Sequence, residues 1–563
     1  MVRSTQSPPS CTCDRRTRYC AAMSTYRLES IFQPASLAVV GGSARARSAG
    51  RAVMRNLRES GYAGRIGWVS PGQGEIDGIA TVPRLRDLPW VPDLAILTAP
   101  PAIVPQLVEE AAVLGVGASV LLTADTGEGR AAFHAAIEQA ARPRGMRILG
   151  PHCLGILSSP AKLNASIAAR TPQAGDVALV SESSAIAAAL VEWGVTRAIG
   201  FSRVVALGDG LDVDFADLLD YLATDPHTRS ILLYVENVGN ARKFMSAARA
   251  AARAKPVVVV RAARPRPAQS FSEIGMRALA PTEAVHAAAF RRAGLLQVDA
   301  LDELFAAAET LSTLHTFPGR RLAILGNGGG VGLLAAQQLQ QLGGTLATLS
   351  ADTVAALDGL LDCGWSHENP VDIVVDADGA RYATAVEALL ADPGNDALMV
   401  INVPTAFSAP METAGALTGA LARRKGAAAR KPVFAVWLTD DDQAHAALHA
   451  ARVPSYDTET EAVHGFMHLV RYREAQQALM ETPPSLPRDF TVDAATARAL
   501  VGEAVERGEV QLDPQTTARI LAAYGLDYEP PLAAADADAA VRIAEPLLAA
   551  GRTVAVKIDS GDI

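Results

Sequence analysis

Short β-branched apolar runs alternate with alanine-rich amphipathic stretches along most of the chain. This alternation is typical of parallel α/β folds, in which a helix follows each strand and covers one face of the sheet. In the first part of the chain, one apolar run leads into a glycine turn and a helix then starts near Gly50. The pattern predicts an open sheet over about residues 28–155, with strands at 35–40, 65–69, 93–98, 119–123 and 147–149.

The same pattern continues through two further units and is then interrupted by prolines. The second unit has predicted strands at 176–181, 203–207, 230–236 and 256–261, and the third at 321–326, 396–402, 432–438 and about 453–456. The proline-rich segment 482–487 predicts a linker. We expect a disordered head at 1–27, within which translation starts at Met23. Domains are expected at 28–155, 156–312 and 313–481. A linker and helix at 482–509 and an incomplete domain at 510–563 are expected to follow.

Composition narrows the class of protein without identifying its chemistry. The 563 residues are 49% hydrophobic, which leaves room for roughly three to five buried cores. The formal charge of -9 argues against nucleic acid or an anionic membrane as the main partner. No apolar run reaches the ~18–20 residues of a spanning helix, and residues 1–22 lack the apolar core of a secretory signal. We therefore expect a soluble, cytoplasmic protein.

The cysteines and histidines do not form a recognisable metal motif. Cys11, Cys13 and Cys20 lie in the head with no fourth ligand nearby. His464 and His468 share a helix face at spacing i, i+4, but no glutamate-bearing motif accompanies them. A structural role is favoured for both histidines, and no metal site is predicted.

Gly41-Gly42-Ser43 ends one predicted strand and opens a helix, where free backbone N–H groups and the helix dipole favour phosphate. A nicotinamide dinucleotide site fits poorly, because the turn lacks Gly-x-Gly-x-x-Gly. The next strand also ends at Ser70-Pro71 with no acidic residue for a ribose diol. The turn therefore indicates a phosphate-bearing ligand other than NAD, with a purely structural tight turn as the alternative.

A second strand-to-helix turn follows at residues 181–184, Ser-Glu-Ser-Ser. Its hydroxyl and N–H groups suit either a phosphoryl group or simple capping of the helix. Glu236 ends a neighbouring strand, and this end of an open α/β sheet is where ligands bind. Solvation of the carboxylate is the competing interpretation.

The segment from Phe271 to Gly294 contains Ala-Leu-Ala-Pro-Thr-Glu followed by Ala-Ala-Ala-Phe-Arg-Arg-Ala-Gly. It resembles the phosphohistidine loop of ADP-forming acyl-CoA synthetases, relatives of succinyl-CoA synthetase. That loop reads close to His-Thr-Gly-Ala-Leu-Ala-Gly, then an acidic residue and Ala-Ala-Phe-Arg-Arg-Ala-Gly. Counting back from Phe290 places Gly275 where the family has its histidine nucleophile.

This resemblance implies a Rossmann-like CoA-binding domain, two flavodoxin-like CoA-ligase subdomains and a truncated start of an ATP-grasp domain. Residues 149–155, Leu-Gly-Pro-His-Cys-Leu-Gly, resemble the family's Gly-Pro-Asn-Cys-Leu-Gly. Cys153 is expected to be a buried neighbour of the CoA thiol rather than a nucleophile. The resemblance implies CoA or acetyl-CoA at Gly41, Gly42, Ser43, Ser70, Pro71, Thr98, Pro100, His152 and Cys153.

The resemblance also assigns the second turn, with departures that weaken phosphoryl transfer. Ser181 and Ser183 match the family's Ser-Gln-Ser-Gly turn, but Glu182 replaces the glutamine. Glu236 matches the glutamate that steadies the phosphohistidine, and Lys557 matches a lysine that ATP-grasp domains present to nucleotide phosphates. ATP or ADP with Mg²⁺ is expected only if that domain were complete.

Three further stretches, residues 206–214, 218–223 and 466–473, resemble bacterial protein lysine acetyltransferases. Those proteins carry a degenerate synthetase region, without the histidine, ahead of a GNAT domain. The leading hypothesis is therefore a regulatory pseudo-synthetase that binds CoA or acetyl-CoA and is inactive as a ligase. The alternative is an ADP-forming acetate or acyl-CoA ligase that acts with a partner nucleotide-binding subunit, and an inert remnant of a frameshifted gene is the third hypothesis. The expected partners are an acyl-CoA small molecule and either a second copy of the chain, in a homo-oligomer, or an ATP-grasp subunit.

Overall fold

The computed structural model describes residues 25–556, except 43, 44, 46, 73, 124, 126, 128, 197, 198, 263–281, 314–318, 362, 363, 425, 427–430, 482–491, 510, 511, 527 and 529–531. It divides into one large compact unit that ends at Met480 and a smaller unit that follows it. None of the described helices combines the length and the hydrophobicity that a membrane crossing requires.

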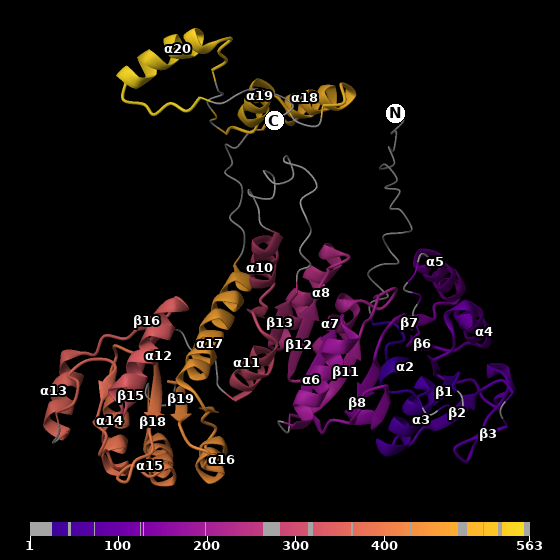
Figure 1. The fold of residues 1–563 in the computed structure, drawn as a ribbon, viewed down its shortest axis with the longest axis horizontal. Coiled ribbons are helices and arrows are strands. Elements are labelled where there is room, and N and C mark those ends of the chain that lie inside the picture. The colour runs from indigo at the N-terminus through magenta and orange to yellow at the C-terminus, as the bar shows by residue number, and fades with distance from the viewer. Residues whose placement is uncertain are drawn as a thin grey trace, which may run out of the picture. The chain divides into compact units, whose positions relative to one another are not determined.

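The first sheet has five parallel strands in the order β2-β1-β5-β6-β7 (Figure 1). Its strands are β1 (Ser36–Val40), β2 (Arg65–Val69), β5 (Leu94–Leu97), β6 (Ala118–Leu121) and β7 (Arg147–Leu149). The hairpin β3 (Glu75–Ile76) and β4 (Ile79–Ala80) stands apart from it. The accompanying helices are α2 (Glu29–Phe32), α3 (Ala49–Glu59), α4 (Val104–Leu114) and α5 (Arg130–Ala141).

The second sheet has seven strands in the order β14-β13-β12-β10-β11-β8-β9. Its parallel part is β10 (Ala174–Ser181), β11 (Phe201–Ala206), β12 (Ser230–Val235), β13 (Val257–Arg261) and β14 (Leu296–Val298). The antiparallel strands β8 (Gly155–Ser158) and β9 (Leu163–Ser166) extend one edge. The helices are α6 (Ser184–Thr196), α7 (Phe215–Thr224), α8 (Ala241–Ala254), α10 (Thr282–Arg292) and α11 (Leu301–Thr313).

The third sheet has the order β16-β15-β18-β19-β20, with β17 paired to the end of β15. Its strands are β15 (Arg321–Gly326), β16 (Thr345–Leu346), β17 (Val371–Asp372), β18 (Ala397–Asn402), β19 (Val433–Trp437) and β20 (Ser455–Tyr456). The helices are α12 (Gly329–Gln341), α13 (Ala351–Leu360), α14 (Gly379–Ala391), α15 (Pro410–Arg423), α16 (Asp442–Ala450) and α17 (Glu459–Met480). The smaller unit contains α18 (Ala494–Glu506), α19 (Pro514–Ala523) and α20 (Ala537–Ala549).

Each sheet contains five parallel strands in one shared order, in which the first strand in sequence lies between the second and the third; in the third sheet these are the strands other than β17. This is the flavodoxin-like 2-1-3-4-5 arrangement, and its ligand site lies at the switch point between the first and third strands. The predicted mixed α/β fold is confirmed. The β8–β9 hairpin and the two-residue strands β16 and β17 were not predicted, because such short segments carry too little periodicity. The predicted domain boundaries remain predictions.

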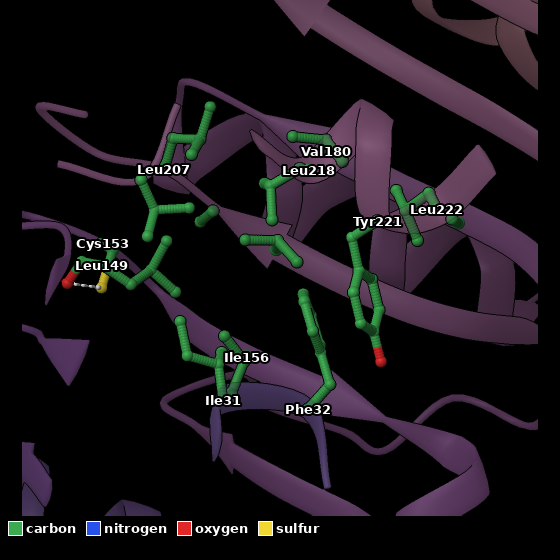
Figure 2. Close-up of a cluster of buried hydrophobic side chains, with 14 of the residues drawn as sticks. Ile31, Phe32, Leu149, Cys153, Ile156, Val180, Leu207, Leu218, Tyr221 and Leu222 are labelled. Atoms are coloured by element: carbon green, nitrogen blue, oxygen red, sulfur yellow. Dashed lines mark hydrogen bonds between the residues drawn. The ribbon is translucent and has the colours of Figure 1, made fainter. Parts of the chain in front are cut away.

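The first two sheet domains share an apolar core. Phe32 of α2 stacks on Tyr221 of α7, with ring centroids 4.6 Å apart. Figure 2 shows Ile31 and Phe32 facing this second-domain helix, with Cys153 and Ile156 in the same cluster. Segments far apart in the sequence therefore bury one continuous surface, and the two domains are held in a fixed relation.

A buried ion cluster lies at the same joint. Arg147 of β7 donates from Nε to Asp212 Oδ2 at 2.9 Å and from Nη2 to Asp217 Oδ2 at 3.0 Å. Asp217 is 2% exposed and also accepts from Lys243 Nζ at 2.8 Å. The chain carries this arginine in the first sheet and its carboxylates in the second domain. The ion cluster therefore fixes which faces of the two domains meet.

Replacing Arg147 should loosen this joint. Arg147→Met leaves two carboxylates short of a buried partner, which typically costs roughly 3 kcal/mol. We expect faster amide exchange in both 145–150 and 209–217, measured by hydrogen exchange with mass spectrometry. The matched control is Arg229→Gln, whose exposed pair with Asp176 should contribute little. Unchanged protection in Arg147→Met would contradict a stabilising role for the cluster.

Candidate functional site

The first glycine turn lies at the switch point between β1 and β5. Gly41 and Gly42 both have φ of 106°, which favours glycine. A Cβ on Gly41 would lie 2.7 Å from Thr98 Oγ1, and one on Gly50 would lie 2.8 Å from the Cα of Gly42. The turn is therefore packed between the end of β5 and the first turn of α3. This close approach explains the glycines at all three positions, as in dinucleotide-binding turns.

The carbonyl groups of this turn are fixed from β2. Trp68 donates from Nε1 to the carbonyl of Gly41 at 2.9 Å. Ser70, which is buried, donates its hydroxyl to the carbonyl of Gly42 at 3.2 Å. The structure thus brings Ser70 and Thr98 to the turn: Ser70 through this hydrogen bond and Thr98 through its close packing against Gly41. Their predicted role in CoA binding stays a prediction. Pro71 and Pro100 lie exposed beside them.

A basic cavity of about 850 Å³ opens along α3. Arg51 makes a bidentate pair with Asp77, with both N···O distances 2.7 Å, and so links α3 to the turn of the β3–β4 hairpin. The arginines outnumber the two carboxylates in the lining, which favours an anionic ligand. The cavity is lined by Arg47, Ser48, Ala49, Arg51, Ala52, Met54, Arg55, Arg58, Glu59, Trp68, Asp77, Ile79 and Ile167.

The second turn is brought against the segment that carries His152. Ser184 donates its hydroxyl to the carbonyl of His152 at 2.9 Å, at the start of α6. The His152 side chain is 61% exposed, and its Nδ1 lies 4.0 Å from Asp209 Oδ1. Asp209 also accepts from Arg130 and His134 at 2.8 and 2.9 Å, contacts that the sequence pattern did not reveal. His152 is therefore available to a ligand on its exposed side.

Cys153 lies next to His152 but faces the interior. It is 3% exposed, and its Sγ donates to the carbonyl of Leu121 at 3.2 Å. Burial raises the pKa of the Cys153 thiol to about 12. A thiol in this state is a poor nucleophile at neutral pH.

The serines of the second turn bond within the turn itself. Ser181 donates its hydroxyl to the carbonyl of Ser183 at 2.8 Å, and the Ser183 hydroxyl accepts the N–H of Ile186 at 3.3 Å. Ser183 therefore caps α6, which is the simpler of the two interpretations left open by its sequence.

The unexpected residue at this turn is Glu182. Its Oε2 accepts the backbone N–H groups of Glu236 and Asn237 at 2.8 and 2.9 Å. Two N–H groups at the end of β12 are thereby committed to a carboxylate. The contact follows from the strand order, because β10 and β12 are neighbours and their ends meet. It places two acidic residues, Glu182 and Glu236, together at the second switch point.

Three predicted positions, Ser43, Gly275 and Lys557, lie outside the described residues. The described segments on either side of the loop with Gly275 are joined by an ion pair between Arg261 of β13 and Glu283 of α10.

Two family models match the chain. A model described as a CoA binding domain matches residues 35–159, and one described as a succinyl-CoA ligase like flavodoxin domain matches residues 174–311. The first match contains the glycine turn and every residue that lines the basic cavity except Ile167. The second contains the turn at residues 181–184.

The chain is similar over most of its length to ligases. It is 30% identical to acetate–CoA ligase (ADP-forming) I of Archaeoglobus fulgidus, over 95% of this chain and 76% of that protein. It is 32% identical to the α subunit of acetate–CoA ligase (ADP-forming) I of Pyrococcus furiosus, over 79% of this chain and 97% of that subunit. These relatives do not support the proposed relation to lysine acetyltransferases.

A solved structure shares the fold. It is the dinucleotide-forming acetyl-coenzyme A synthetase 1 of Ca. Korarchaeum cryptofilum, in complex with phosphate and ADP. The TM-score is 0.71 at 29% identity, with 82% of this chain and 99% of that chain covered.

The Cys153 thiol should resist alkylation in the folded protein. With its pKa raised to about 12, roughly one thiol in ten thousand is ionised at pH 8. We expect iodoacetamide at pH 8 to leave Cys153 unmodified in native protein and to modify it fully in urea, as measured by peptide mass spectrometry. Rapid native labelling of Cys153 would contradict its assignment as a buried, unreactive thiol.

Proposed function

The chain belongs to the family of ADP-forming acetate–CoA ligases, and we propose that it binds CoA and acyl-CoA thioesters as the α-subunit-like part of such a protein. The observation that carries this proposal is the basic cavity beside the tightly packed Gly41–Gly42 turn. A volume of about 850 Å³ lies in the usual range for small-molecule sites. A helix start, a glycine turn and arginines are together suited to phosphate.

We assign the phosphate-rich nucleotide end of CoA to the cavity along α3. Arg51 and Arg55 present guanidinium groups there, and Arg51 is held in place by Asp77. The acyl-thioester end then extends along the strand ends toward His152 and the second turn. The contact between Ser184 and the carbonyl of His152 supports this path, because it brings the first and second domains together at one edge.

The ligase reaction needs a phosphoryl carrier between acyl phosphate and ADP, and in this family that carrier is a histidine. Gly275 occupies the corresponding position and has no nucleophilic atom. A ligase built on this chain would therefore need its phosphoryl carrier from another residue, and we assign that carrier to a partner subunit. The relative from Pyrococcus furiosus is itself named an α subunit, which supports a ligase divided between chains.

A regulatory acyl-CoA-binding role is the second candidate, and Glu182 favours it. The carboxylate of Glu182 occupies two N–H groups at the end of β12, those of Glu236 and Asn237, and so lies beside Glu236. An incoming phosphoryl group would meet two like charges there. Both candidate functions require CoA binding. They differ in whether the chain takes part in the conversion of acyl-CoA to free CoA with ADP and phosphate.

Binding should depend on the arginines of the cavity. We expect acetyl-CoA to bind the full chain in titration calorimetry, and Arg51→Gln and Arg55→Gln each to weaken binding about tenfold or more, since each removes a charge-assisted contact. Arg65→Gln is the matched control, because Arg65 is an exposed residue of β2 outside the cavity. Absence of heat at millimolar acetyl-CoA, or equal binding by all variants, would contradict the proposed site.

Turnover separates the two candidates. We expect the chain alone to release no CoA from acetyl-CoA when ADP and phosphate are supplied, as followed by thiol titration, because residue 275 is glycine. Release that requires a co-purified ATP-grasp subunit would support the ligase assembly. Release by the chain alone would show a phosphoryl carrier elsewhere in it and overturn the regulatory candidate.

A further inference from the structure

Two histidines and a glutamate from distant parts of the chain meet where the second and third sheet domains join. His464 and His468 lie one turn apart on α17, and Glu303 comes from the first turn of α11. Helix α17 packs against α11 of the second domain and α12 of the third, so its position is fixed from both sides (Figure 1). The glutamate that the sequence motif lacked is supplied through the fold.

The donor atoms of the three side chains converge. His464 Nδ1 lies 3.0 Å from Glu303 Oε1, and His468 Nε2 lies 3.8 Å from Glu303 Oε2. Each of the three residues offers one donor atom, and these three atoms all lie within 4.8 Å of one another. Ligands at about 2.0–2.2 Å from zinc in a tetrahedral site are about 3.3 Å apart. The observed separations therefore need only small side-chain shifts to surround one ion.

His468 gives an independent indication of a ligand. His468 is fully buried, with 0% of its surface exposed. Neither of its ring nitrogens has a hydrogen-bond partner among the residues that the structure describes. A buried polar group without a partner costs about 1–3 kcal/mol. A metal ion bound to Nε2 would satisfy the ring nitrogen that is directed at Glu303.

The surroundings provide the outer contacts that metal ligands need. The amide of Gln338 on α12 lies 3.4 Å from His464 Nε2, the ring nitrogen that faces away from Glu303. With Nδ1 on a metal, Nε2 carries the proton, and the Gln338 side chain can accept it after a half-turn of its amide. Glu303 Oε2 also accepts the N–H of Asp299 at 3.1 Å, which orients its carboxylate. Such outer partners commonly orient metal-bound histidine and carboxylate.

We propose that Glu303, His464 and His468 bind one divalent transition-metal ion of the zinc class. Two imidazoles and one carboxylate suit zinc or cobalt(II), whereas calcium and magnesium prefer all-oxygen sites. The side chains of Glu303 and His464 are 17% and 25% exposed, so an ion can enter from that side and keep a water as its fourth ligand. The bound ion tethers α11 of the second domain to α17 of the third.

The competing arrangement is a metal-free cluster in which protonated His464 pairs with Glu303. Direct metal measurements distinguish the two. The full chain, without an affinity tag and with Cys11, Cys13 and Cys20 changed to serine to remove the thiols of the head, is stripped with a chelator. It is then titrated with cobalt(II) by absorption and with zinc by elemental analysis. We expect one equivalent of metal per chain, no binding of magnesium, and slower amide exchange in α11 and α17 when zinc is bound.

Variants assign the ligands. Glu303→Gln and His464→Gln should each weaken cobalt binding at least about 100-fold, while Gln338→Leu should weaken it about tenfold as expected for an outer contact. His449→Asn is the matched control, since His449 is an exposed histidine of α16, and it should bind like the parent. Circular dichroism of the metal-free proteins establishes that each variant folds. The proposal would be overturned if the parent failed to bind zinc. It would also be overturned if Glu303→Gln and His464→Gln bound the metal as tightly as the parent.

Discussion

The buried contact of Arg147 with Asp212 and Asp217 determines how the first two domains meet, and the candidate site depends on that relation. Beside it, the backbone of residues 209–213 bonds along residues 148–151, with Val213 N to the carbonyl of Ile148 at 3.1 Å. These bonds fix the chain just before His152. The exposed His152 therefore meets the start of α6, and two turns from separate sheets share one edge. Without this joint, each turn would be only a local anion-binding or capping motif.

The main parallel strands of the three sheets share one order, but the residues at their switch points differ. The first has the glycine turn beside an arginine cavity, and the second has an acidic turn closed by Glu182. In the third, the side chain of Asn327 bonds both backbone groups of Val403 and accepts from the Tyr382 hydroxyl, so the turn is held by buried structural contacts. A shared topology thus supplies a favourable place for a ligand, while the side chains at each turn decide whether it is used.

Sequence periodicity was enough for the fold because most of the parallel strands are short, largely apolar runs, and most of them are followed by a helix. The strand at 65–69 was predicted with its observed bounds. The glycine turn was also predictable, since it follows a local motif. The contacts of Glu182, Asp209 and Glu303 were not, because each depends on which strand ends or helix faces become neighbours in space. Local patterns identify candidate residues, but only the folded chain pairs them.

The charge distribution along the shared edge bears on which end of a ligand lies where. The α3 side carries the arginines of the cavity, and the second turn carries Glu182 and Glu236. The CoA thioester that we propose for this edge is strongly anionic at its nucleotide end and neutral at its acyl end, so this polarity would orient it in one direction. The same polarity disfavours phosphate beside the thioester, which is where an acyl phosphate would form. Under the regulatory candidate, the acidic turn and the glycine at position 275 would act in the same sense, favouring recognition of a neutral acyl group over transfer of a phosphoryl group.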